Sequence, residues 1–469
     1  MVDGYAPFVP PTAVLAEVDV SDPAAMRLVR TLSVEGTYLS ARLVGSTVRV
    51  VLSSPPAGIE FAYPQASGLQ AEAAAERRNR RAIATSTLKN WVPRYTLENR
   101  ATRRTRKGAV LDCQDVRHPQ QFSGLGLLTV LTIDLDRGLQ PIDSDAVMTA
   151  GDIVYASTGS LYVATQRWVD WVARSQSGDV PQGMATILHK FDISSPDGTE
   201  YRASGEVPGF LLNQWSMSEH EGHLRVASTD VPTWWTEGPP RENESFVSVL
   251  EEKGGKLVSV GRVGDLGRGE RIYAVRFIGD VGYVVTFRQT DPLYTIDLSN
   301  PERPAVLGEL KILGYSAYLH PIGDDLLLGI GQDATEEGRA LGTQLSVFDV
   351  SDLAKPARLH QLKLGQAWSE AESDHHAFLY WPATGLTVVP VQSYSLDEIT
   401  GQESWFAGAI GARVGRAGGI EQIGTISHPQ GDVIRRSLVV GDALYTVSEQ
   451  GVEASGLGTL AKRAWLSFT

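Results

Sequence analysis

The chain has 469 residues, carries a formal net charge of −13 and contains a single cysteine, Cys113. The acidic balance argues against nucleic acid as a partner, and one cysteine excludes an intramolecular disulfide and any cysteine-rich metal centre. No stretch approaches the roughly 20 consecutive apolar residues of a membrane-spanning helix, so we expect no such segment.

The N-terminal residues, MVDGYAPFVPP, lack both a basic region and an apolar stretch. The sequence therefore predicts no signal peptide at this position.

A unit made of a strand, an Asp-containing turn and a second strand recurs along the chain. Its first copy covers residues 13–36 and turns at Asp19; two closely similar copies turn at Asp297 and Asp349, 52 residues apart. Asp and Ser side chains in such turns bond backbone amides two residues on, and a nearby proline presets φ. Strand repeats with a period near 50 residues are typical of the blades of a β-propeller.

A long insertion, residues 56–125, separates the two halves of one expected blade. Within it, residues 70–89 are rich in Ala, Glu and Arg, which predicts a helix. Residues 54–110 contain 11 Lys/Arg and 4 Asp/Glu, in contrast to the acidic remainder. This segment is interpreted either as a solvated helix that offsets the acidic body or as a surface for a polyanion.

The repeats together predict an all-β fold in a single domain, residues 1–469. We expect seven complete four-stranded antiparallel blades plus an extra N-terminal strand pair, so seven or eight blades, with the helical insertion. A strand pair without partners would leave exposed edges, which favours the hypothesis that the natural protein begins further upstream.

Several blocks of sequence resemble a bacterial and archaeal family of secreted β-propellers that is distantly related to WD40 repeats. The resemblance is carried mainly by residues 271–391: VRFIG from Val275, DPLY from Asp291, YLHPI from Tyr318 and DHHAF from Asp374. It implies a propeller fold and an extracellular or cell-envelope location, and it implies no particular activity.

The candidate site lies at the expected channel mouth, because the innermost strand of each propeller blade lines the central channel. The predicted ligand-binding residues are Arg42, Arg276, His320, Asp374, His375 and Arg436. We interpret them as a polar network of Arg276, Asp374 and the histidines that satisfies itself, or as a binding site for an anionic small molecule or peptide. A third alternative is a metal site at Asp374, His375 and His376, because two imidazoles and a carboxylate suit zinc, copper or iron. We expect no metal and no cofactor, because adjacent residues on a strand, such as His375 and His376, point to opposite faces.

These features favour a non-enzymatic binding or scaffold module of the bacterial cell envelope. Its expected partner is a small molecule, a peptide or an envelope protein, and the oligomeric state is left open. The alternative is a channel-mouth enzyme, either a hydrolase or a metal-dependent oxidoreductase. It would use Asp374, His375, His320 and Arg276, since perturbed titratable groups gather at functional sites.

Overall fold

The computed structural model describes residues 11–22, 25–119, 122–167, 184–231, 242–288, 290–396 and 403–468. Contacts divide the chain into two compact units, each of which is considered by itself. The first comprises residues 1–214, 221–224 and 250–259, and the second comprises residues 215–220, 225–249 and 260–469. That the chain is one continuous domain stays a prediction.

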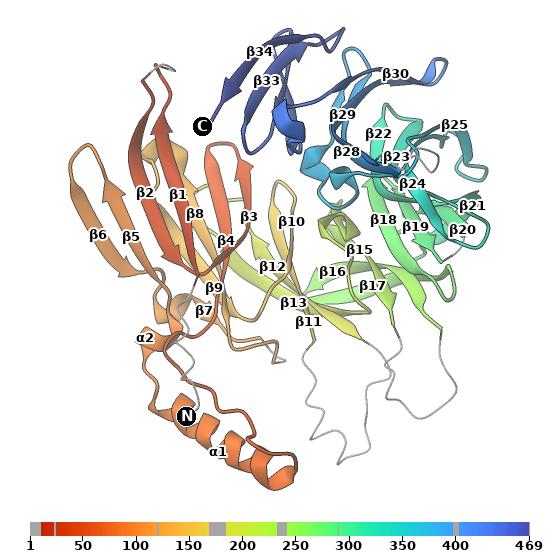
Figure 1. The fold of residues 1–469 in the computed structure, drawn as a ribbon. Helices are drawn as coiled ribbons and strands as arrows, with labels where there is room; N and C mark the ends of the chain where they lie inside the picture. Colours follow the sequence, from red (N-terminus) through yellow and green to blue (C-terminus); the bar gives the residue numbers. More distant parts are fainter. Residues whose placement is uncertain are drawn as a thin grey trace. The chain divides into compact units, whose positions relative to one another are not determined.

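The first unit contains two sheets at its N-terminal end, one antiparallel and one mixed (Figure 1). One has the order β1-β2-β5-β6, formed by Thr12–Asp19, Arg27–Glu35, Arg94–Asn99 and Arg104–Ala109. The other has the order β3-β4-β8-β9-β7, formed by Thr37–Val44, Thr47–Ser54, Leu127–Asp134, Pro141–Met148 and Val116–Arg117, with β7 parallel to β9. The two sheets share a core in which Leu32, Val50 and Leu131 are fully buried.

The sequence suggested that the N-terminal strand pair has no partners, but in the structure it has them. β5 comes from within the insertion and pairs with β2, Leu97 lying opposite Leu32. β6 then pairs with β5 and completes a four-stranded sheet. The edge of β2 that the sequence left without a partner is therefore covered by β5.

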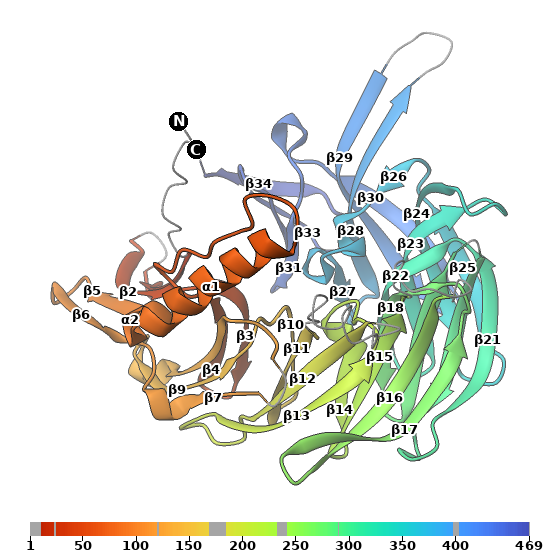
Figure 2. The same ribbon diagram turned by 90° about the horizontal axis from the view of Figure 1, so that it is seen from below.

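The same insertion carries the helices. α1 (Leu69–Thr85) and the single turn α2 (Leu88–Trp91) lead from β4 to β5 (Figure 2). Ala75 is the one buried residue of α1, so this helix adds little to the core. The Trp91 indole donates a hydrogen bond to Ser86 Oγ at 2.7 Å, which ties the two helical segments together.

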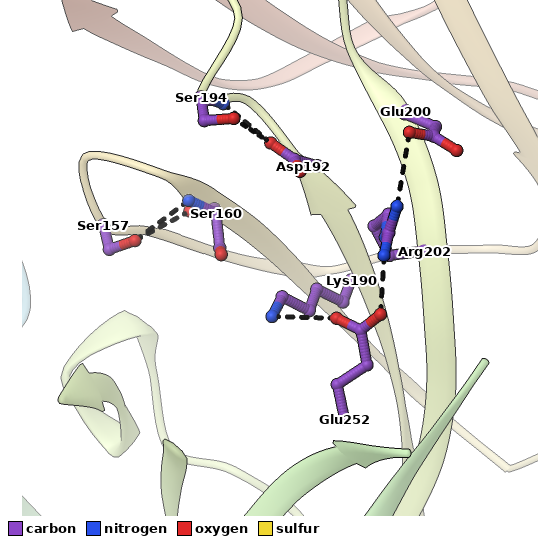
Figure 3. A network of polar contacts seen from close by, with 8 residues as sticks. All are labelled: Ser157, Ser160, Lys190, Asp192, Ser194, Glu200, Arg202 and Glu252. Carbon is purple, nitrogen blue, oxygen red and sulfur yellow. Dashed lines mark hydrogen bonds and ion pairs between the residues drawn. The ribbon is translucent and has the colours of Figure 1, made fainter. Parts of the chain in front are cut away.

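The first unit also contains β10 (Ile153–Ala156), β11 (Ser160–Gln166), β12 (Ala185–Asp192) and β13 (Glu200–Pro208). Beside β13, residues 256–257 of β17 pair in parallel with residues 204–205. Glu252 anchors this region, because it pairs with Lys190 at 3.1 Å and with Arg202 at 3.3 Å (Figure 3). Arg202 in turn reaches Glu200 at 3.5 Å.

The boundary between the units runs through the next strands, β14 (Met217–His220), β15 (His223–Asp230), β16 (Glu244–Lys253) and β17 (Lys256–Leu266). The second unit continues with two regular antiparallel sheets. One runs β18-β19-β20-β21, formed by Arg271–Ile278, Val281–Phe287, Thr290–Asp297 and Ala305–Leu313. The next runs β22-β23-β24-β25, formed by Tyr315–Ile322, Leu326–Ala334, Ala340–Asp349 and Ala357–Lys363.

Two more sheets complete the second unit. In one, β26-β28-β29-β30 comprise Ala367–Trp368, Leu386–Leu396, Glu403–Gly415 and Gly419–Ile426, and β27 (Leu379–Trp381) also pairs with β28. In the last, β31-β32-β33-β34 comprise Arg436–Val440, Ala443–Val447, Gly451–Gly456 and Lys462–Ser467.

The repeated aspartate turns have the expected local structure. The amides of Ser299 and Ser351 donate to Asp297 and Asp349, in both cases Oδ1, at 2.9 and 3.0 Å. Ser194 donates in the same way to Asp192 (Figure 3). The hydrogen bonds from Ser299 hold the pKa of Asp297 below its usual value, so these carboxylates serve the turns.

Candidate functional site

Five of the six predicted site residues belong to the second unit. Arg276, His320 and Arg436 lie on β18, β22 and β31, each the first strand of its sheet; the sheets of β18 and β22 are successive, and the β26–β30 sheet separates them from that of β31. Strand β18 packs against β22, and β31 packs against the turn that carries His375. These residues are therefore presented from neighbouring elements of one unit.

Asp374 and His375 do not open a strand, contrary to the prediction. His375–Ala377 forms the single-turn 3-10 helix η5, with Asp374 at its N-cap. The Asp374 carboxylate accepts a hydrogen bond from the His376 amide at 3.0 Å, and this local bond competes successfully with strand pairing.

Arg276 stacks on an aromatic ring instead of pairing with an acid. Its guanidinium carbon lies 4.0 Å from the centroid of the Trp215 ring. Burial lowers the pKa of Arg276, with only a small opposing effect from Tyr318. Its Nη1 is buried and has no hydrogen-bond partner among the described residues.

Trp215 connects Arg276 to the histidine turn. The His375 ring meets the indole edge-to-face at a centroid distance of 5.0 Å. The Arg276 guanidinium and the His375 imidazole therefore lie no more than about 9 Å apart, close enough to contact one small ligand.

His320 is enclosed by aromatic side chains. Its Nδ1 shares a hydrogen bond with Tyr318 Oη at 3.1 Å, and its ring packs 4.9 Å from Phe378 and 5.3 Å from Tyr380. Burial, assisted by the charge of Arg276, lowers the pKa of His320 to about 4. His320 is consequently neutral near pH 7 and contributes no charge to the cluster.

Asp374 is paired, although not with Arg276. Arg436 Nη2 lies 2.9 Å from Asp374 Oδ2, and His376 Nδ1 lies 3.1 Å from Asp374 Oδ1. Burial raises the pKa of Asp374, but the His376 amide and the charge of Arg436 outweigh it, and the net shift is downward. Among the described residues, no ion pair joins Arg276 to Asp374, so these two side chains do not satisfy each other as they would in a self-sufficient polar network.

Arg42 belongs to the first unit, on β3. Its guanidinium donates to Gln214 Oε1 at 2.5 Å, to Val154 O at 3.2 Å and to Ser40 Oγ at 2.5 Å. Burial lowers its pKa as well. In contrast to Arg276, Arg42 donates hydrogen bonds to acceptors of its own unit. This arrangement is that of a structural residue.

The site therefore contains Arg276, Trp215, Tyr318, His320, His375, Asp374 and Arg436 within one unit. Prediction missed the part played by Tyr318. Its signal was available, because residues two apart on a strand share a face and Tyr318 is two residues before His320. The turn that places His376 beside Asp374 had no comparable signal, because strand alternation was assumed there.

The repeated four-stranded antiparallel sheets are those of a β-propeller. The family model described as a β-propeller domain matches residues 4–460, and the chain belongs to that family.

The chain is also similar to two curated relatives. Both are named only as uncharacterized proteins and are 47% identical over the matched segment, one in Archaeoglobus fulgidus over 205 residues and one in Methanocaldococcus jannaschii over 177. The segments cover 44% and 38% of this chain but 29% and 26% of those relatives, so the chain spans less than a third of their length.

Solved structures are similar at the level of fold alone. A putative 6-phosphogluconolactonase from Bacteroides uniformis has a TM-score of 0.39 at 11% identity, covering 72% of this chain and 92% of that one. Sqt1 from Chaetomium thermophilum has a TM-score of 0.31 at 13% identity, covering 54% and 71%. In the part of the chain that the structure describes, no helix is long and apolar enough to cross a membrane.

Proposed function

We propose that this β-propeller is a binding module that holds an anionic group of a small molecule or peptide against Arg276. The observation that carries the proposal is the half-buried side chain of Arg276, stacked on Trp215 at 4.0 Å with a buried Nη1 that has no hydrogen-bond partner among the described residues.

A buried cation is costly unless its charge and its hydrogen-bond donors are satisfied. Stacking on an indole offsets part of that cost by about 1–2 kcal/mol, but it leaves the in-plane N–H donors unused. A carboxylate or phosphate accepts two parallel hydrogen bonds from a guanidinium, so an anion in the plane of Arg276 would supply what the protein does not.

Aromatic rings beside Arg276 favour a ligand with an apolar or planar part next to its anionic group. Trp215 and Tyr318 lie within 6.3 Å of each other, centroid to centroid, and Tyr318 is itself buried. Sites of this kind combine apolar walls with a small number of polar groups that fix the orientation of the ligand.

The enzymatic alternative has weaker support. Among the described residues, no hydrogen bond joins His320 to Asp374. Asp374 is held by Arg436 and His376, whereas His320 is bonded to Tyr318. General acid–base catalysis requires such groups within hydrogen-bond reach of one another or of a common substrate atom.

The proposal is tested by titrating the protein with citrate and with pyrophosphate and following heat by calorimetry. We expect saturable binding that Arg276→Gln abolishes. The matched control is Arg262→Gln, because Arg262 also stacks on a ring of the second unit, Phe246, at 5.5 Å, but donates to Ser248 Oγ. Equal binding by the wild type and Arg276→Gln would contradict the proposal.

We further propose, from the resemblance alone, that the module works outside the cytoplasm or at the cell envelope, with a small molecule, a peptide or an envelope protein as its partner. Fractionation of the source cells, with detection by antibody, tests the location. Recovery only with cytoplasmic markers would contradict it.

A further inference from the structure

Three potential metal ligands converge on the turn that follows η4 (Glu370–Glu372). One donor atom each from Asp374, His375 and His376 can be chosen so that all three lie within 4.8 Å of one another. We propose that this turn binds one divalent transition-metal ion. The inference does not depend on anion binding at Arg276.

The local fold explains why two adjacent histidines can share an ion here. In a 3-10 helix successive side chains are separated by about 120°, whereas on a strand they point to opposite faces. The two imidazole rings accordingly lie close, with centroids 4.0 Å apart. The expectation from the sequence that His375 and His376 could not act together rested on the wrong local structure.

The carboxylate is already oriented for this role. Arg436 holds Asp374 Oδ2 at 2.9 Å, while Oδ1 faces the ring of His376 at 3.1 Å. Partners of this kind, behind a ligand, fix its orientation in known metal sites. His375 is steadied from another side by the Trp215 ring at 5.0 Å.

A small adjustment completes the coordination. Ligands about 2.1 Å from a tetrahedral ion lie roughly 3.4 Å apart, so donor atoms that lie within 4.8 Å of one another must close by up to about 1.4 Å. His376 can supply this movement, because 66% of its side chain is exposed.

The donor set identifies the class of ion. Two imidazole nitrogens and one carboxylate oxygen suit Zn²⁺, Cu²⁺, Ni²⁺ or Fe²⁺, whereas Mg²⁺ and Ca²⁺ prefer oxygen alone. Three protein ligands leave at least one coordination position for water or another small ligand.

The experiment uses the full chain without an affinity tag, stripped with a chelator and titrated with Zn²⁺ in competition with a chromophoric chelator. We expect one equivalent to bind. Because loss of an outer partner of a ligand already costs about 10–100-fold in affinity, His375→Ala, His376→Ala and Asp374→Asn should each weaken binding by about 100-fold or more.

The matched control is His220→Ala. His220 Nε2 lies 3.1 Å from Asp280 Oδ1 on the same unit, which gives an exposed histidine–carboxylate pair without a second imidazole. This variant should bind Zn²⁺ as the wild type does. No binding by the wild type, or equal affinity in the three ligand variants, would overturn the proposal.

A second measurement applies even if a ligand variant fails to fold. The wild type loaded with one equivalent of Cu²⁺ should show an electron paramagnetic resonance spectrum with hyperfine coupling to two imidazole nitrogens. A spectrum with coupling to one nitrogen or none would contradict a site built from both histidines.

Discussion

The Arg276 guanidinium lies over the ring of Trp215 at 4.0 Å, while Asp374 is bound by Arg436 at 2.9 Å. The two charges thus have separate partners. Replacing Arg276 leaves no carboxylate without a partner. The free energy of unfolding of such a variant therefore distinguishes a structural role for Arg276 from a binding role.

Replacing Arg276 by Met should therefore cost about 1 kcal/mol or less in the free energy of unfolding, because Met keeps apolar contact with the indole. Breaking a buried ion pair would cost about 3–5 kcal/mol instead. Urea melts of the wild type and Arg276→Met measure the difference. A loss of 3 kcal/mol or more would mean that Arg276 is a structural cation after all.

His189 should make the first unit sensitive to acid. It is fully buried on β12, its Nδ1 bonds Tyr201 Oη at 3.1 Å, and burial lowers its pKa to about 4. The folded state therefore binds this proton less readily than the unfolded state, whose pKa is about 6.5.

Above pH 6.5 His189 is neutral in both the folded and the unfolded state, and the free energy of unfolding has its full value. As the pH falls from 6.5 toward 4, the unfolded state binds the proton first and this free energy decreases. Between pH 7 and pH 4.5 the loss should be about 2–3 kcal/mol. Urea melts of His189→Gln at both pH values should lack this component, whereas His223→Gln, which alters a partly exposed histidine, should keep it. An identical pH dependence in His189→Gln and the wild type would contradict the assignment.

Glu252 should matter more than Glu200, although both contact Arg202 (Figure 3). The Glu252 side chain is 23% exposed and also pairs with Lys190, whose side chain is 12% exposed; Glu200 is 68% exposed. Glu252→Gln should cost about 1–3 kcal/mol, because it removes the acid facing two cations, and Glu200→Gln less than about 0.5. Thermal melts of the two variants give the comparison, and equal losses would contradict it.

The insertion should divide into a dispensable part and an essential part. Replacing residues 69–85 by a short Gly-Ser linker removes α1, which has one buried residue, and should leave cooperative unfolding intact. Deleting residues 60–105 also removes β5 and uncovers Leu32 and Val34, both fully buried on β2.

The larger deletion should cost at least about 3 kcal/mol, since each uncovered side chain is worth about 1.5–3 kcal/mol. From the sequence alone, the insertion predicts a propeller that folds without residues 60–105, whereas the pairing of β5 with β2 predicts the opposite. Circular dichroism melts of both variants check it, and equal stability would show that β5 is not part of the core.

The sequence was informative where structure depends on neighbours along the chain. The turns at Asp297 and Asp349 form because each carboxylate bonds an amide two residues on, and the strands of these repeats pair with adjacent strands. The placement of Arg276 and His320 on the first strands of successive sheets follows from the same repeat.

The sequence was uninformative where pairing strands are distant along the chain, or where a side-chain hydrogen bond overrides the strand pattern. β5 pairs with β2, about 65 residues earlier, and no periodicity announces that match. The choice between a strand and η5 depends on one hydrogen bond from His376 N to Asp374. Which residue stacks on Arg276 depends on packing between elements, and composition does not encode it.

The Arg276 guanidinium should bind an external anion through its N–H groups. The NMR signals of those N–H groups test this binding most directly. Nuclear magnetic resonance spectra of deuterated, ¹⁵N-arginine-labelled protein, with Arg276 assigned by Arg276→Lys, should be recorded during titration with pyrophosphate. We predict a saturable shift of the Arg276 side-chain signals, with those of Arg262 unchanged. Arg276 signals that stay fixed while binding is observed by calorimetry would contradict the account.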